Sequence, residues 1–341
     1  GPNSSDTITI GLASIAPTSL GAYISTGPTR EALAAAQTAS ANSTTNSEDI
    51  IFTSNGLTTT IDVAAADSAK IVAAKINAVT YETKIEADGQ TFGHLFSTNA
   101  SSASYTIKIN GNSTSSFSIS SSDATDAVSK INLISDVTGV IASATTANKV
   151  LLHDSTGEDI AIENAASGGD LDIQAVQYDG ETTQGNAISL AAGGASDNDA
   201  SRIIGNLRVS SKDEFTISQS GSSSTAYLSS ETPSLTALSS IDLSNSNSAS
   251  NAITIIGNAI EQVSDIRSSV AAYQNRIEFS ESLSEKQIAE LRVAKGAIID
   301  VDFAAESAKL AREMVLKEIN TAVLAQANAS RDLVLKLLNS Q

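Results

Sequence analysis

Short segments in which apolar and polar residues alternate dominate the first two thirds of the chain. Examples are Thr58–Val63, Tyr105–Asn110, Phe117–Ser120 and Glu214–Ser218, each bounded by Gly, Asn, Ser or Asp. This period of two, with Thr, Ile, Val and Phe well represented, is typical of half-buried strands joined by turns. The pattern therefore predicts a β-rich region from residue 6 to about residue 240.

Two features within this region have the pattern of helices. Residues 29–41 follow a proline and are rich in alanine, which favours a short helix. The second feature is a repeat: Lys75-Ile76-Asn77 is followed by Val79-Thr80, and Lys130-Ile131-Asn132 is followed by Val137-Thr138. Each copy predicts a strand, an acidic N-cap, a short helix and a further strand. Because a solenoid generally needs about three repeats, two copies indicate two small α/β modules.

The pattern changes in the last third of the chain. Ser, Thr and Asn dominate residues 222–249, which predicts a linker. From Asn251 onward apolar residues recur at steps of three or four, which predicts a long core helix within residues 241–299. The candidate packing or interface residues of this helix are Ile256, Ile260, Val263, Arg267, Val270, Gln274, Asn275 and Arg276.

A second helical run is predicted over residues 303–338. It follows Asp300-Val301-Asp302, an acidic group that suits a helix N-terminus because of the helix dipole. Its apolar stripe is wide, and such a helix is marginally stable alone in water, so it requires packing against a partner. The residues predicted to meet that partner are Phe303, Ala311, Met314, Val315, Ile319, Ala322, Val323, Ala327, Leu333, Val334, Leu337 and Leu338.

Composition narrows the possible functions. With 38 acidic and 20 basic residues the net charge is −18, which disfavours binding to nucleic acid or to anionic membranes. The absence of cysteine excludes disulfides, thiolate metal sites and thiol nucleophiles. No uncharged apolar stretch approaches the roughly 18 residues that span a bilayer. Low aromatic content also disfavours a carbohydrate-binding platform.

No set of side chains has the spacing of a catalytic or metal site. His94 and His153 lack a His-Glu-x-x-His or similar motif. Asp197-Asn198-Asp199 and Gly168-Gly169-Asp170 resemble fragments of calcium loops without the full ligand series, so turns are expected there. Gly193–Ser196 lacks the Gly-Lys-Ser/Thr of a phosphate loop and predicts a flexible loop. We expect no enzymatic activity, no metal and no cofactor.

A series of short motifs lies between Ile241 and Leu338 and includes Ala259–Val263, Gln274-Asn275-Arg276, Asp300–Ala304 and Ala325–Asn328. In order and spacing this series resembles the carboxy-terminal part of bacterial flagellins. The resemblance and the patterns together predict an α+β fold: a β-rich outer domain with two small α/β repeat modules, followed by long carboxy-terminal α-helices.

The resemblance also implies a domain organisation. Residues 1–5 read as the remnant of a cleaved tag, and residues 6–47 as the end of an amino-terminal core region with strands and a short helix. Residues 48–240 would form the outer variable domain, 241–299 the carboxy-terminal core helix, and 300–341 the terminal amphipathic helix. In the family, amino-terminal helices pair with these carboxy-terminal ones, and we expect them to precede this sequence in the native chain.

In function, the resemblance implies a structural subunit of the extracellular flagellar filament, assembled through terminal coiled-coil helices. The implied partners are other flagellin subunits, the export chaperone FliS and the flagellar type III export gate, with no nucleic acid and no membrane insertion. The apolar residues of the terminal helix would contact the chaperone or neighbouring subunits. An apolar helix without a partner is otherwise prone to aggregate.

Some positions depart from the family pattern and leave alternatives open. Val270–Tyr273 stands where flagellins usually carry Leu-Gly-Ala, and Arg331 replaces a usual proline. Arg267 and Gln274–Arg276 suit either a subunit contact or a solvated helix face. A flagellin-like hook-filament junction protein and an outer-domain adhesin that binds glycans are the alternative functions.

Overall fold

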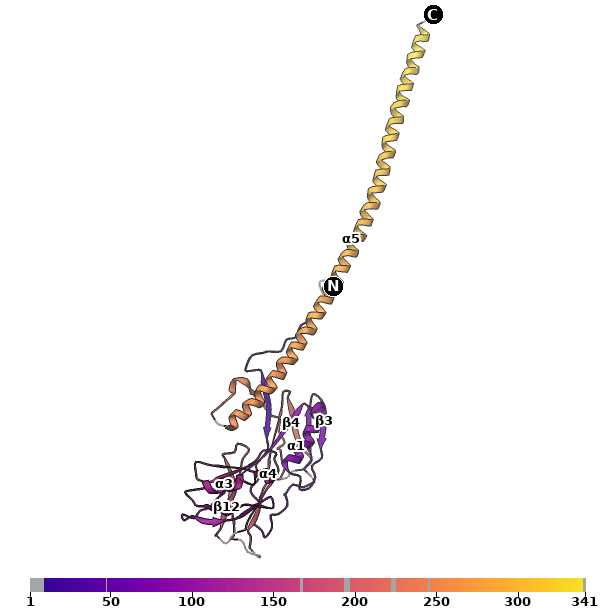
Figure 1. Cartoon of the computed structure of the whole chain (residues 1–341). Coiled ribbons are helices and arrows are strands. Elements are labelled where there is room, and N and C mark those ends of the chain that lie inside the picture. The colour runs from indigo at the N-terminus through magenta and orange to yellow at the C-terminus, as the bar shows by residue number, and fades with distance from the viewer. Residues whose placement is uncertain are drawn as a thin grey trace. The chain divides into compact units, whose positions relative to one another are not determined.

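The computed structural model describes residues 9–46, 48–165, 168–192, 197–221, 225–244 and 246–339, without the side chains of residues 246, 247, 301 and 302 (Figure 1). The chain divides into two compact units. One unit is Ala13–Ile266, which we call the head, and the other combines Gly1–Leu12 with Arg267–Gln341.

The described elements of the head are antiparallel strands and a few short helices. In chain order they are β1 (Gly21–Thr26), β2 (Ile50–Ser54), β3 (Leu57–Ile61), α1 (Ala69–Ala78), α2 (Thr80–Thr83), β4 (Ile85–Phe96), β5 (Ala103–Tyr105), β6 (Ile107–Ile109), β7 (Asn112–Ser113), β8 (Phe117–Ile119), α3 (Thr125–Asn132), α4 (Ser135–Thr138), β9 (Ile141–Ala144), β10 (Val150–Asp154), β11 (Ile160–Asn164), β12 (Leu171–Val176), β13 (Thr183–Leu190), β14 (Ala200–Ile203), β15 (Asn206–Ser211), β16 (Phe215–Gln219), β17 (Leu235–Ala237) and a 3₁₀ turn at Leu238–Ser240. A single helix, α5 (Ser246–Leu338), begins in the head and continues through the other unit. The α+β class is confirmed.

The long strand β4 connects two parts of the main sheet, which runs β13-β12-β4-β15-β1-β17. Its first half, residues 85–90, pairs with β15, and its second half, residues 91–96, pairs with β10 and β12. Smaller sheets within the described residues run β14-β11-β6-β7, β16-β2-β3 and β5-β8. One strand therefore ties the two halves of the head together.

The two predicted modules are present and have the same structure. In the first, β3 leads to α1, α2 and β4, and in the second β8 leads to α3, α4 and β9 (Figure 1). The side-chain amide of Asn77 donates to the carbonyl of Ala87 at 2.9 Å and accepts from its N–H at 2.8 Å. Asn132 makes the same two bonds with Ala142, at 2.9 and 2.7 Å. In both modules an asparagine at the helix end thus fixes the strand that follows.

The structure corrects two details of the modules. The counterpart of Val79-Thr80 is Ile134-Ser135, not Val137-Thr138. Val79 and Ile134 each lie two residues after the asparagine of their module and directly before the second short helix. The N-cap residues are Ser68 and Ala124 rather than the preceding acidic residues. Those aspartates serve the adjoining turns instead, as when Asp123 Oδ1 accepts the N–H of Thr125 at 2.9 Å.

Each module contributes to one of two hydrophobic cores in the head. The first core includes Phe52, Ile76 and Leu207, and the second includes Tyr105, Ile131 and Ile162; all six side chains are at most 1% exposed. Ile76 and Ile131 are equivalent positions of the two modules. The apolar residue of each Lys-Ile-Asn motif is therefore a core residue.

The short helix predicted for residues 29–41 does not form. This segment has no regular secondary structure apart from a bridge between Ala36 and Ala200, and it bonds to β14, with Leu33 N–H donating to Arg202 O at 2.9 Å and Ala36 N–H to Ala200 O at 2.8 Å. Because its backbone groups find partners on a neighbouring strand, they do not need a helix. The alanines are small enough for this close approach, and Ala32 is buried in the second core.

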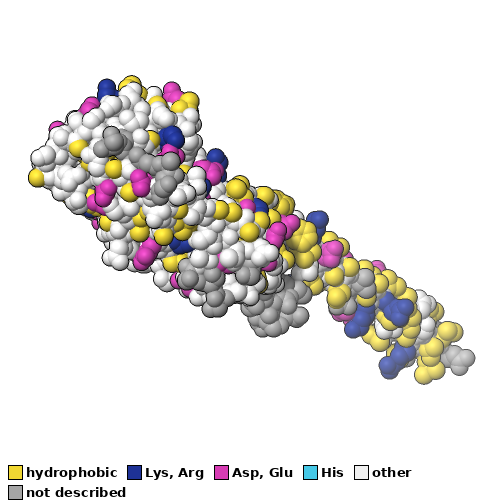
Figure 2. Space-filling model, turned by 90° about the horizontal axis from the view of Figure 1, so that it is seen from below, with side chains coloured by type: hydrophobic (Ala, Val, Ile, Leu, Met, Phe, Trp, Pro, Cys, Tyr) yellow, Lys and Arg dark blue, Asp and Glu magenta, His cyan; other side chains and the backbone are white. Residues whose placement is uncertain are grey.

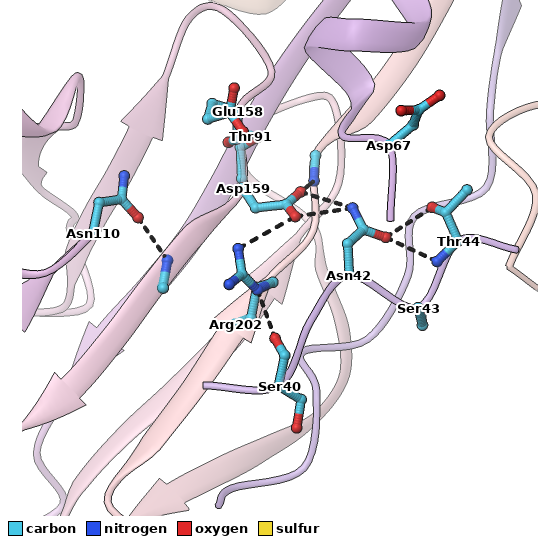
Figure 3. Close-up of polar contacts among 12 residues, drawn as sticks. Ser40, Asn42, Ser43, Thr44, Asp67, Thr91, Asn110, Glu158, Asp159 and Arg202 are labelled. Atoms are coloured by element: carbon cyan, nitrogen blue, oxygen red, sulfur yellow. Dashed lines mark hydrogen bonds and ion pairs between the residues drawn. The ribbon is translucent and has the colours of Figure 1, made fainter. Parts of the chain in front are cut away.

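A buried polar cluster holds the end of that segment against the head (Figure 3). The side-chain amide of Asn42 donates to both carboxylate oxygens of Asp159, at 3.1 and 2.9 Å, and to the hydroxyl of Tyr227 at 3.0 Å. Arg202 lies 3.5 Å from the same carboxylate and donates to the carbonyl of Ser40 at 2.7 Å. Burial raises the pKa of Asp159, while these donors oppose the shift. The cluster is structural, since its groups satisfy one another.

Two expectations for the last third of the chain were also wrong. The described part of the predicted linker includes β17 and the side chains of Tyr227 and Leu228, which are at most 3% exposed. The two predicted helices are one, because α5 passes through Asp300 without interruption. No proline occurs in this stretch, and an acidic pair alone does not end a helix.

Candidate functional site on helix α5

The first turns of α5 use one side to pack within the head. Ala252, Ile255 and Ala259 are at most 4% exposed. Gln262 continues this side, accepting the N–H of Gly21 at 3.0 Å and donating to the carbonyl of Lys212 at 2.6 Å. This face fixes the start of the helix.

The apolar residues predicted for the core helix lie on other sides of α5. Ile256 is 42% and Ile260 61% exposed, so neither packs into the head. Val263 and Val270 are half-buried. Arg267 and the Gln274-Asn275-Arg276 set are exposed on the helix surface. In the isolated chain these polar side chains are therefore open to solvent.

All described side chains of residues 303–338, which we call the terminal segment, are exposed. The exposed fraction is 74% for Phe303, 64% for Met314 and 67% for Leu337. The other residues predicted for the interface are equally open: Ala311, Val315, Ile319, Ala322, Val323, Ala327, Leu333, Val334 and Leu338. Such a series of large apolar side chains in water is typical of an interaction surface.

Exposed leucines beyond the predicted set also occur in the terminal segment: Leu310, Leu316 and Leu324 are 51–66% exposed. Leu310 and Ile319 are nine residues apart, which is about two and a half helical turns, so they face opposite directions. A helix that is apolar on several sides is typical of one buried on several sides in its functional state.

Charge is distributed very unevenly along the chain. Residues 267–341 contain ten acidic and ten basic side chains, so the whole net charge of −18 lies in residues 1–266. In Figure 2 hydrophobic side chains lie along the helix among Lys, Arg, Asp and Glu, while white, which marks the backbone and the remaining side chains, covers most of the visible head surface. A neutral apolar helix can approach other copies of itself without net repulsion.

The two histidines lie in buried surroundings, and the loops that resemble calcium or phosphate sites lie elsewhere in the sequence. Burial lowers the pKa of both histidines, that of His94 to about 4 with help from the ammonium of Lys149. The His153 ring stacks on Phe92 with centroids 4.3 Å apart. Asp197–Asp199 and Gly168–Asp170 join no metal-binding group among the described residues, where no cluster of three or more His, Cys, Asp or Glu occurs. Gly193–Ser196 lies outside the described residues.

No helix in the described part of the chain is long and apolar enough to cross a membrane. The terminal segment, although rich in leucine, carries charged residues throughout most of its length.

Comparisons with known proteins converge on this helix. Residues 253–338 match the family described as the bacterial flagellin C-terminal helical region. The chain is 26% identical to B-type flagellin from Pseudomonas aeruginosa over 280 residues, which is 81% of this chain and 57% of that protein. It is 41% identical to flagellin from Clostridium tyrobutyricum over 88 residues, 26% of this chain and 23% of that protein. Polar flagellin B/D from Vibrio parahaemolyticus is 27% identical over 191 residues, 56% of this chain and 48% of that protein.

The chain spans less than two thirds of the length of each of these relatives. The similarity to the Pseudomonas protein extends well beyond α5, because 280 aligned residues must include much of the head.

Proposed function

The chain belongs to the bacterial flagellin family, and on this basis we propose that it is a structural subunit of the extracellular flagellar filament. Its role is structural rather than enzymatic. The terminal segment packs against neighbouring subunits in coiled-coil fashion, and the head faces solvent. Export through the flagellar type III gate precedes assembly.

The observation that carries this proposal is the exposure of apolar residues on several sides of one helix. Fully burying a leucine or phenylalanine contributes about 1.5–3 kcal/mol relative to leaving it in water. The terminal segment holds many such side chains, all exposed in the isolated chain. A single partner helix would cover only one side, whereas neighbours in a filament surround each subunit.

The absence of cysteine permits a direct test by thiol labelling. Ser101 in the head and Met314 in the terminal segment are both exposed in the monomer. In cells that use this protein as flagellin, a Ser101→Cys variant should label along extracellular filaments with a thiol-reactive dye. A Met314→Cys variant should label in the monomer and become protected in intact filaments.

The proposal requires both labelling results. Absence of label on extracellular filaments from Ser101→Cys would contradict the filament role. Equal labelling of Met314→Cys in filament and monomer would show that the terminal segment is not the assembly surface.

We further propose that the terminal segment is covered by the chaperone FliS before export. The same apolar residues that drive assembly would aggregate if left uncovered in the cell. An amphipathic helix that lies in an apolar groove is a common form of such recognition. Leu333, Val334, Leu337 and Leu338 form a dense apolar group near the end of α5 and suit this contact.

Calorimetric titration of FliS with Leu337→Asp tests the chaperone proposal. If this side chain is buried in the complex, a charge there should weaken binding by roughly 2 kcal/mol or more. A head variant, Ser101→Asp, serves as the matched control and should bind like the unchanged protein. Unaltered affinity of Leu337→Asp would remove this leucine from the contact, and no binding by the unchanged protein would refute the proposal.

A further inference from the structure

The head contains two Asn-Gly hairpin turns with nearly identical backbones. Asn55-Gly56 joins β2 to β3 with φ angles of 50° and 79°, and Asn110-Gly111 joins β6 to β7 with 49° and 81°. Positive φ at both central residues is the type I′ arrangement that Asn-Gly favours in two-residue hairpins. The two turns therefore differ in their surroundings and not in their backbone conformation.

The surroundings immobilise one asparagine. Asn110 Oδ1 accepts the N–H of Ala161 at 2.9 Å, and Nδ2 donates to the carbonyl of Thr138 at 3.1 Å. The Asn110 N–H also donates to the carbonyl of Ala161 at 2.9 Å. Backbone and side chain of Asn110 are thus bound to β11 and to the end of the second module.

The other asparagine is free. Asn55 is exposed, and its side chain makes no hydrogen bond within the described part of the chain. A Cβ at Gly56 would meet nothing within 4 Å, and the same holds at Gly111, so the two turns differ in the contacts of their asparagines and not in those of their glycines. The β2–β3 ladder ends at the pair Ser54 and Leu57, which leaves the Gly56 nitrogen outside it.

We propose that Asn55 is a site of spontaneous deamidation in the folded protein and that the fold protects Asn110. The backbone nitrogen of Gly56 forms a bond to Cγ of Asn55, and the side-chain amide leaves as ammonia. Water then opens the resulting succinimide at either carbonyl, which gives aspartate or isoaspartate without any change in oxidation state. Glycine promotes the first step because no side chain hinders its nitrogen.

The free rotation of the Asn55 side chain lets Cγ reach the Gly56 nitrogen. In Asn110 the same movement must break the bonds to Ala161 and Thr138. Each such bond contributes about 0.5–1.5 kcal/mol, and a factor of ten in rate corresponds to about 1.4 kcal/mol. We therefore expect Asn55 to react about tenfold faster than Asn110, or more.

Conversion of asparagine to aspartate has different structural effects at positions 55 and 110. Asp-Gly supports the same turn as Asn-Gly, so an aspartate at position 55 leaves the hairpin intact and adds negative charge to a head that already holds 27 acidic and 10 basic residues in positions 13–266. A carboxylate at position 110 would face the carbonyl oxygen of Thr138 and lose a donor. The exposed asparagine, Asn55, is therefore also the one whose conversion to aspartate leaves the local structure intact.

Peptide mapping by mass spectrometry after incubation of the native protein at mildly alkaline pH tests the inference. Conversion at position 55, detected as acid and as isoaspartate, should exceed conversion at position 110 by about tenfold or more. In denaturant the two Asn-Gly sites should convert at similar rates, because the protecting contacts are gone. An Asn55→Gln variant should remove the reaction at position 55 and leave the circular dichroism spectrum unchanged.

Equal conversion of the two sites in the native protein would overturn the inference, as would faster conversion at position 110. An intact Asn55 in native protein whose denatured form reacts would show that the hairpin suppresses the reaction, and would equally overturn it.

Discussion

At the scale of single residues, the clearest design in the head is the pair Asn77 and Asn132. Each side-chain amide makes two hydrogen bonds to one residue of the following strand, Ala87 or Ala142. The Lys-Ile-Asn repeat was visible in the sequence and correctly indicated two modules. The role of the asparagine was not predictable, because its partner lies ten residues later and becomes adjacent only when the chain turns back.

Replacement of Asn132 should therefore destabilise the second module. Asn132→Ala leaves the N–H and carbonyl of Ala142 without their partner, and we expect a loss of about 1–3 kcal/mol in the free energy of unfolding. Urea titration followed by circular dichroism measures it. The exposed Asn186 gives the control, since Asn186→Ala should change stability by no more than about 0.5 kcal/mol. Equal stabilities of the two variants would contradict the role assigned to Asn132.

His94 makes the head sensitive to acid. Burial and the nearby Lys149 lower its pKa from 6.5 to about 4, so the unfolded chain binds a proton more readily than the folded one. Stability contributed by neutral His94 is present above pH 6.5 and is lost as the pH falls toward 4. The melting temperatures of the unchanged protein and of His94→Gln should be measured across this pH range. The difference between them should be smaller at low pH than at neutral pH. A constant difference between them would show that His94 does not titrate in this way.

At the scale of elements, the sequence predicted those whose periodicity is local and failed where distant contacts decide. The alternating strands and the two modules formed as expected. Residues 29–41 had helical composition, but their backbone groups form hydrogen bonds with β14 instead of with one another. The break expected at Asp300 rested on a charge signal without a proline or glycine to end the helix, and α5 is continuous there.

For the interface, the apolar periodicity identified Met314, Ile319 and Leu337, all exposed on α5. It passed over Leu310 and Leu324, which are equally exposed, although Leu310 lies one helical turn from Met314 and on the same side. In this segment the number of apolar residues therefore indicated the exposed apolar surface better than their positions around the helix did.

The unpacked part of α5 should respond to helix propensity alone. Gly296 lies within it, and a Cβ there would meet nothing within 4 Å. Gly296→Ala should therefore stabilise the local helix by about 1 kcal/mol, because alanine loses less backbone entropy. Hydrogen exchange should show rapid exchange beyond Asp300 in the unchanged protein and slower exchange around position 296 in the variant.

This prediction has a matched control in the same helix. Gly257 is equally open at Cβ but lies where α5 packs within the head, so Gly257→Ala should leave exchange around position 296 unaltered. Strong protection of residues 303–338 in the monomer would contradict the view that this segment depends on a partner.

At the scale of the whole molecule, the separation of charge from apolar surface is the main feature. Residues 1–266 carry the entire net charge of −18, and residues 267–341 are neutral overall. Subunits that associate through the neutral helix would bring their acidic heads near one another. Repulsion among the heads then opposes assembly, while burial of apolar side chains drives it.

Added salt should therefore strengthen the association of copies of this chain with one another. Screening shortens the range of the repulsion from about 10 Å at 0.1 M to about 3 Å at 1 M ionic strength, and apolar burial does not weaken in the process. Sedimentation velocity of the protein at increasing sodium chloride should show a larger associated fraction at a given concentration. Leu324→Asp should abolish this response, because a charge in the apolar surface weakens the apolar association that head repulsion opposes at low salt. Dissociation on adding salt would instead mean that ion pairs of the helix, such as the 4.0 Å pair of Lys309 with Glu306 and its intermolecular equivalents, hold the copies together.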